Sequence, residues 1–174
     1  VKDILAAVFH TIQSAYITSG QRCTYARRLI VPEGHAGDRF IDALRKAVGQ
    51  IQVGAYNLQP APFMGAMISN TAVDNVVGMA RTLIEQGAQP LVELHRPDPQ
   101  HAYLTPGLID VTKVKNREDK ECFGPLLQVI RVPDLDAAIL EANNTRLGLS
   151  AGVLSDNPQV FHQFDRNVRA GLIN

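Results

Sequence analysis

A cysteine that ends a small-residue turn is the side chain with the most evident chemistry in this sequence. Positions 19–23 read Ser-Gly-Gln-Arg-Cys, and an apolar run begins at position 28. A thiolate attacks carbonyl carbons, and turn N–H groups that point at the sulfur favour the thiolate and can stabilise an oxyanion. Gly20 permits a close backbone approach. Cys23 is therefore a candidate nucleophile, although a lone cysteine in a turn also fits a purely structural role.

A second motif stands just before another apolar run. Positions 121–125 read Glu-Cys-Phe-Gly-Pro, and the run begins at Leu126. A carboxylate accepts hydrogen bonds from two hydroxyl groups, and an aromatic ring packs against another planar ring. Glu121 and Phe123 are therefore candidate binding residues, whereas Cys122 is expected to be inert. A Gly-Pro turn with a solvated Glu121 is the structural alternative.

Hydrophobic periodicity predicts the elements that position these motifs. Apolar residues at helical spacing predict helices over 3–13, 38–48, 70–87, 134–142 and 157–168. Asp3 is the expected N-cap of the first helix, and Asn70 or Thr71 that of the third. In the last helix, Val160, Phe161 and Phe164 are expected to face inward. Short apolar runs predict strands over 28–31, 91–94, 108–111, 126–132 and 149–154.

The order of these elements indicates the fold class. Strands and helices alternate along the chain, which favours an α/β fold with a mostly parallel open sheet and helices on both faces. The glycine-rich fingerprint GxGxxG is absent, so the chain is not itself a dinucleotide-binding unit.

Composition narrows the classes of partner. Lys plus Arg equals Asp plus Glu at 17 each, which argues against bulk electrostatic attraction to nucleic acid or an anionic membrane. No apolar run approaches the ~20 residues of a membrane span. Five histidines show no paired ligand spacing, so no metal site is expected. Two cysteines form no CxxC pair, and positions 1–4 show no signal-peptide pattern, so we expect reduced thiols and a cytoplasmic protein.

Taken together, the two motifs resemble those of the NAD(P)-dependent aldehyde dehydrogenases. That family shows Gly-Gln-x-Cys after a small residue and Glu-x-Phe-Gly-Pro at about the spacing found here. Positions 143–151 are similar to a third family segment, with Leu147 where an aromatic residue is usual. The resemblance extends over essentially all 174 residues.

The resemblance implies a role for each motif. Cys23 would attack the aldehyde and carry it as a thiohemiacetal and then a thioester. Glu121 would bind the hydroxyls of the ribose next to nicotinamide, and Phe123 would pack near the nicotinamide ring. The implied cofactor is NAD or possibly NADP, the partner is a small aldehyde, and the full-length enzyme is expected to be a homo-oligomer.

Further segments resemble one branch of the family, which acts in bacterial arginine catabolism on an aldehyde carrying two carboxylates. These segments are positions 26–29, 104–107 and 142–146. Arg22 and Thr24, on either side of Cys23, are the implied substrate-binding residues. Adjacent strand residues point to opposite faces, so at most one of Arg27 and Arg28 can reach the site.

Other parts implied by the family have no match in the sequence. The glutamate general base, the asparagine of the oxyanion hole and the NAD-binding domain would all precede Val1. We therefore expect residues 1–174 to be a catalytic domain truncated at both ends, and we expect this segment alone not to turn over.

Two other functions remain open at this point. One is an NAD-independent cysteine hydrolase or acyltransferase, which needs a histidine base, and His10 is the nearest in sequence. The other is a folded, non-catalytic segment whose exposed strand edges promote self-association.

Overall fold

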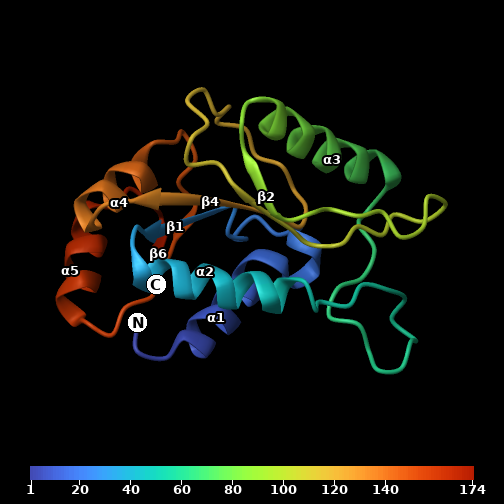
Figure 1. Cartoon of the computed structure of the whole chain (residues 1–174), viewed down its shortest axis with the longest axis horizontal. Coiled ribbons are helices and arrows are strands. Elements are labelled where there is room, and N and C mark those ends of the chain that lie inside the picture. Colours follow the sequence, from blue (N-terminus) through green and yellow to red (C-terminus); the bar gives the residue numbers. More distant parts are fainter.

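A four-stranded sheet runs through the centre of the chain (Figure 1). The computed structural model describes all 174 residues. The strands are β1 (Arg28–Pro32), β2 (Gln89–Val92), β3 (Gly107–Asp110) and β4 (Leu126–Val132), in the spatial order β1-β4-β3-β2. β4 lies parallel to both β1 and β3, and β2 is antiparallel to β3. The predicted α/β class is confirmed, with a mixed, mostly parallel open sheet.

The antiparallel edge strand follows from the connection between β2 and β3. A parallel pair needs a crossover of a dozen or more residues, usually a helix. Positions 93–106, which link β2 to β3, contain no helix and include the turn at 99–102. The chain therefore returns beside β2 in the opposite direction.

Alternation along β4 creates a core on each face of the sheet. Leu126 and Ile130 pack in one cluster with helix α3 (Asn70–Glu85), and Leu127 and Val129 pack in another with α1 (Ile4–Tyr16) and α2 (His35–Val48). Figure 1 shows α3 on one side of the sheet and α1 with α2 on the other. Because both faces are covered, the parallel strands read as continuous apolar runs.

A smaller unit lies at one end of the sheet. It consists of α4 (Leu135–Asn143), α5 (Pro158–Asn167) and the two-stranded parallel sheet of β5 (Ser150–Ala151) and β6 (Leu172–Ile173). Its buried core is Ile139, Phe164 and Val168. The strand expected over 149–154 is thus only two residues long, since its only strand partner is the short β6. Of the residues of α5 expected to face inward, Phe164 is buried as expected, whereas Phe161 is 39% exposed.

Hydrogen bonds at helix ends explain the remaining boundaries. Asp3 caps α1 as expected, since its side chain accepts from the amide of Ala6 at 2.9 Å. α3 is capped by Ser69, which accepts from the amide of Ala72, and not by Asn70 or Thr71. α2 begins three residues before the expected Asp38, because Gly34 at φ +86° already accepts the first helical hydrogen bond. None of the helices has both the length and the apolar character needed to cross a bilayer.

The central strand provides a direct test of this core. Leu127 is fully buried, whereas Leu140 on α4 is 74% exposed. Truncating a fully buried leucine leaves a cavity, so we expect Leu127→Ala to lower the free energy of unfolding by about 2–5 kcal/mol. Leu140→Ala should change it by less than about 0.5 kcal/mol. Urea unfolding of both variants measures the difference, and equal losses would contradict the assigned core.

Candidate active site

The turn before the cysteine is built from three consecutive residues in the left-handed region. Helix α1 ends at Tyr16 and a short 3₁₀ helix, η1 (Ile17–Gly20), follows. Within it, Thr18, Ser19 and Gly20 have φ values of 54°, 55° and 65°. The buried Ser19 hydroxyl donates to the carbonyl of Gly65 at 2.9 Å, which holds this strained turn in place.

Cys23 lies in a tight turn that exposes its side chain. The amide of Tyr25 donates to the carbonyl of Arg22 at 3.2 Å, so Cys23 and Thr24 are the two central residues of a four-residue turn. Cys23 is a free thiol, and Arg22, Cys23 and Thr24 are all exposed. The structure therefore places the expected nucleophile and both expected substrate-binding residues together and open to solvent.

The two sequence motifs touch through a pair of glycines. A Cβ atom added to Gly20 would lie 2.2 Å from the carbonyl oxygen of Gly124, so no residue with a side chain fits there without a shift. Gly124 is equally confined from its other side, where an added Cβ would lie 2.3 Å from Val76. The close approach expected at Gly20 is thus present, and its partner is the second motif.

Side chains fasten residues 119–123 to residues 21–27, which we call the cysteine loop. The hydroxyl of Tyr25 donates to the carbonyl of Cys122, and the Tyr25 ring lies against that of Phe123 with 5.9 Å between centroids. The guanidinium of Arg27 donates to the carbonyl of Lys120 at 2.9 Å and to the carboxylate of Asp119 at 3.2 Å. These contacts leave Glu121 exposed and Phe123 44% exposed, so both remain available to a ligand.

Asp119 is the charged centre of this junction. Burial alone would raise its pKa, but the amide of Arg146, the hydroxyl of Thr145 and the guanidinium of Arg27 donate to it. Together they hold the pKa of Asp119 well below its usual range. The carboxylate is therefore ionised at neutral pH and ties the 143–147 loop to the same junction.

Both motifs lie at the amino ends of adjacent parallel strands. Residues 19–27 lead into β1 and residues 119–125 lead into β4. At the start of β3, Gly107 donates to the carbonyl of Pro125 at 2.7 Å and accepts from the Tyr16 hydroxyl at 3.0 Å. Parallel pairing thus brings segments about a hundred positions apart to one edge of the sheet.

Gln21, the glutamine of the cysteine motif, braces a neighbouring loop. Its side-chain oxygen accepts from the amide of Ile68 at 2.9 Å, and its side-chain nitrogen donates to the carbonyl of Thr18 at 3.3 Å. The residue therefore connects the strained turn to the segment that precedes α3.

Neither Arg27 nor Arg28 is left free for a substrate. The two point to opposite sides, as adjacent extended residues do. Arg28 donates to the carbonyls of Glu141 and Ala142, both at 2.9 Å, and forms an ion pair with the Glu141 carboxylate. It therefore supplies donors to the carbonyls of the last turn of α4.

The other reactive side chains lie in different surroundings. Burial raises the pKa of the half-buried Cys122 thiol, which disfavours the nucleophilic thiolate. His10 is exposed on α1, where its ring meets that of Phe9 at 5.5 Å, and no hydrogen bond joins it to Cys23. No cluster of three or more His, Cys, Asp or Glu side chains is arranged to hold a metal ion.

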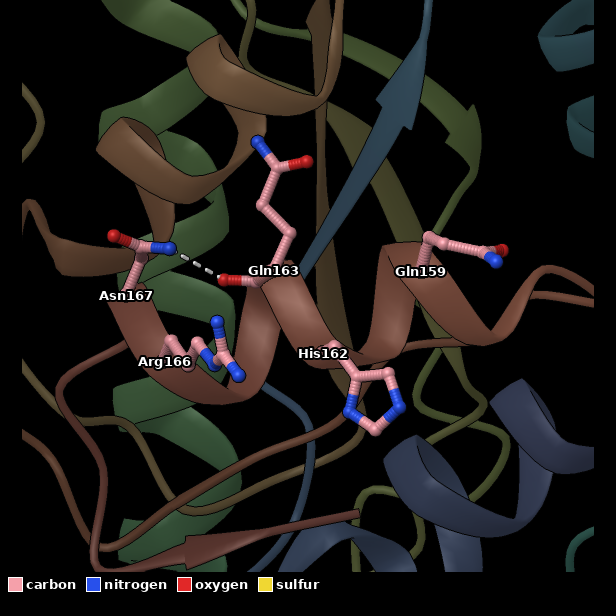
Figure 2. A pocket seen from close by; sticks show the side chains of 5 residues that line it. All are labelled: Gln159, His162, Gln163, Arg166 and Asn167. Atoms are coloured by element: carbon pink, nitrogen blue, oxygen red, sulfur yellow. Dashed lines mark hydrogen bonds between the residues drawn. The ribbon is translucent and has the colours of Figure 1, made fainter.

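Two surface hollows of the chain lie away from both motifs. Figure 2 shows one on the outer face of α5, where Asn167 donates to the carbonyl of Gln163 at 2.7 Å. It is lined by five polar side chains of that single helix. The residues that line a second hollow include Glu33, Gly34, Asp110 and Arg131. They lie at the carboxyl ends of β1, β3 and β4. Neither includes a residue of the cysteine turn.

Sequence reasoning missed Tyr25 and Asp119. A signal for the first existed, because Tyr25 and Arg27 are two positions apart in an extended segment and so point the same way. Asp119 carried no such signal, since its partners come from loops that are distant in sequence.

One family of known proteins matches the whole length of the chain. The profile of the aldehyde dehydrogenase family matches residues 1–174. The chain belongs to the aldehyde dehydrogenase family. The family resemblance that the sequence motifs indicated is therefore confirmed.

Individual aldehyde dehydrogenases are similar over the whole chain. N-succinylglutamate 5-semialdehyde dehydrogenase of Paraburkholderia xenovorans is 47% identical over 174 residues, which are 100% of this chain and 36% of that protein. Succinate-semialdehyde dehydrogenase of Burkholderia pseudomallei is 28% identical with a TM-score of 0.89, over 99% of this chain and 36% of the other. NADP-dependent glyceraldehyde-3-phosphate dehydrogenase of Bacillus halodurans, solved with NADP, is 26% identical with a TM-score of 0.86, over 99% and 35%. The chain thus spans about a third of the length of these relatives.

The glycine contact predicts a large effect for a small substitution. Gly20→Ala adds a Cβ that meets the Gly124 carbonyl. It also places alanine at a positive φ, which is strained for any residue with a side chain. Gly87→Ala is the matched control, because Gly87 has φ +99° but open space around it. We expect Gly87→Ala to lower the free energy of unfolding by about 1–2 kcal/mol, the cost of backbone strain alone. Gly20→Ala should cost clearly more in the same denaturant titration, and equal costs would refute the close contact.

Asp119 predicts a specific dependence of stability on pH. Because folding lowers its pKa below the unfolded value of about 3.9, the carboxylate stabilises the fold above that pH. This stabilisation is lost as the pH falls through the folded-state pKa. Asp119→Asn should therefore lower Tm at pH 7, and the difference from the unsubstituted protein should shrink below about pH 4.

Asp74→Asn is the control for this measurement. Asp74 forms an ion pair with Arg96 on the surface, where its side chain is 65% exposed. Exposed pairs contribute little, so Tm should change only slightly at either pH. A Tm difference for Asp119→Asn that is constant from pH 7 to pH 3 would contradict the role of its charge.

Proposed function

We propose that the full-length protein carrying this chain oxidises N-succinyl-L-glutamate 5-semialdehyde to the carboxylic acid, with NAD or NADP as the hydride acceptor, in arginine catabolism. The observation that carries the proposal is the junction of the cysteine turn with residues 119–125. The 47% identity to an enzyme named for this aldehyde supports the choice of substrate.

Cys23 is the proposed catalytic nucleophile. Its thiolate attacks the aldehyde carbon, a C–S bond forms, and the carbonyl π pair moves to the oxygen to give a thiohemiacetal. Nicotinamide, when bound, supplies the acceptor for the hydride of that carbon. The Cys23 sulfur then carries the acyl group as a thioester until water releases it as the acid and restores the thiol. Exposure of Cys23 in a turn suits this role, because the substrate must reach the sulfur.

Glu121 and Phe123 are the proposed cofactor contacts. An exposed carboxylate can accept hydrogen bonds from both hydroxyls of a ribose, and an exposed ring can pack beside nicotinamide. Their backbone is fixed against the cysteine loop, so a cofactor bound there would lie on the same side as Cys23. The NADP in the Bacillus halodurans relative is consistent with a nicotinamide nucleotide as the ligand class.

Arg22 and Thr24 are the proposed substrate contacts. The aldehyde has two carboxylates, and Arg22 presents an exposed guanidinium beside the nucleophile. We assign the cofactor-binding fold, the general base that activates water and the oligomer contacts to the part of the full-length protein outside this chain. Because the thiols of Cys23 and Cys122 are free, we place the protein in the reducing cytoplasm.

The two cysteines allow a matched test of the nucleophile. Cys23→Ala should abolish NAD-dependent oxidation of N-succinyl-L-glutamate 5-semialdehyde by the full-length protein, with a loss of at least about a thousandfold. Cys122→Ala should retain most of the rate, because that thiol is half-buried and the hydrogen bond to Tyr25 is accepted by the backbone carbonyl, which the substitution keeps. The absorbance of the NADH that forms measures the oxidation rate of both variants. Retained oxidation in Cys23→Ala would overturn the proposal.

A further inference from the structure

The segment that carries the proposed cofactor contacts has no backbone support of its own. Residues 117–123 belong to no helix or strand, and none of their backbone groups pairs with another backbone group. An unsupported segment of this kind would not hold Glu121 and Phe123 in one place. Its position must therefore be set by side chains from elsewhere.

Two of those side chains come from the cysteine loop. Tyr25 binds the carbonyl of Cys122, and Arg27 binds the carbonyl of Lys120 and the carboxylate of Asp119. The contacts bracket Glu121 on both sides and leave its side chain free. Thr145 and Arg146 complete the hold on Asp119 from the opposite side.

These contacts are shielded from water. Tyr25 is 8% exposed and the side chain of Arg27 is 12% exposed. Burial raises the pKa of the Tyr25 hydroxyl, so it stays protonated and remains a donor across the physiological range. Shielded hydrogen bonds to backbone carbonyls are costly to lose, since the carbonyl is then left without a partner.

We propose that Tyr25 and Arg27 are positioning residues for the cofactor, which hold residues 119–123 so that Glu121 and Phe123 face the ligand beside Cys23. This inference rests on the proposed function, because it takes Glu121 and Phe123 as cofactor contacts. It adds a direct link between the nucleophile loop and cofactor binding. Small displacements of binding groups are expensive, so loosening this segment should weaken NAD binding while the thiol stays reactive.

Arg28 provides a matched control next to Arg27. Its side chain is also largely buried, at 16% exposed, but its hydrogen bonds go to the end of α4 and none goes to residues 119–123. Lysine keeps the charge at either position and cannot reproduce two divergent guanidinium contacts. Arg27→Lys therefore loosens residues 119–123, whereas Arg28→Lys loosens the end of α4. Tyr25→Phe removes a single hydrogen bond and keeps the ring against Phe123.

The experiment uses the full-length protein and separates cofactor from substrate. Tyr25→Phe and Arg27→Lys should raise KM for NAD about fivefold to tenfold, the equivalent of one or two hydrogen bonds. KM for the aldehyde and the rate of Cys23 alkylation by iodoacetamide should stay within about twofold, as expected for binding that is lost at the cofactor alone. Arg28→Lys should leave KM for NAD unchanged.

Limited trypsin digestion tests the fastening without any cofactor. Trypsin cuts after lysine, and Lys120 lies inside the segment whose carbonyl Arg27 holds. Arg27→Lys should speed cleavage after Lys120, whereas Arg28→Lys should not, because cleavage needs local opening. This readout stands even if the protein uses another cofactor.

The outcomes are distinct. Raised KM for NAD together with faster cleavage in Arg27→Lys, and neither change in Arg28→Lys, supports the positioning role. Unchanged KM for NAD in both Tyr25→Phe and Arg27→Lys overturns it, while leaving the proposed function intact. If the unsubstituted protein neither binds nor reduces NAD or NADP, the proposed function fails, and the positioning role fails with it, whatever the digestion shows.

Discussion

The contact between Gly20 and Gly124 is the constraint on which the rest of the site depends. Two backbone segments meet there at a distance that excludes any side chain. The strained turn at residues 18–20 brings Gly20 against Gly124, and the buried Ser19 hydroxyl stabilises this turn. Once these glycines touch, the cysteine turn and the segment with Glu121 and Phe123 share one edge of the sheet. The hydrogen bonds of Tyr25 and Arg27 then fix their relative position.

This edge is formed by the amino ends of the parallel strands. In open α/β sheets, ligands generally bind outside the carboxyl ends. Here both motifs precede their strands, and the polar hollow at the carboxyl ends has none of their residues. The candidate site of this chain is therefore built from amino-end loops.

Local patterns predicted the parts of the fold that depend on local physics. The predictions of strand β4 from its apolar run and of the Asp3 cap were correct, because both features depend on residues that are close together in the sequence. The direction of β2, the two-residue length of β5 and the exposure of Phe161 were not predicted, since each depends on a distant partner. Cys23, Glu121 and Phe123 were found as motifs, but Asp119 was not, because its partners Thr145 and Arg146 are brought near only by the fold.

A crystal structure of the full-length protein with NAD would test this site most directly. We expect the ribose beside nicotinamide to hydrogen-bond to the Glu121 carboxylate, with the nicotinamide ring next to Phe123 and facing the Cys23 sulfur. Tyr25 and Arg27 should keep their bonds to residues 119–122. A cofactor bound away from Glu121, with Cys23 facing no part of it, would contradict the central claim.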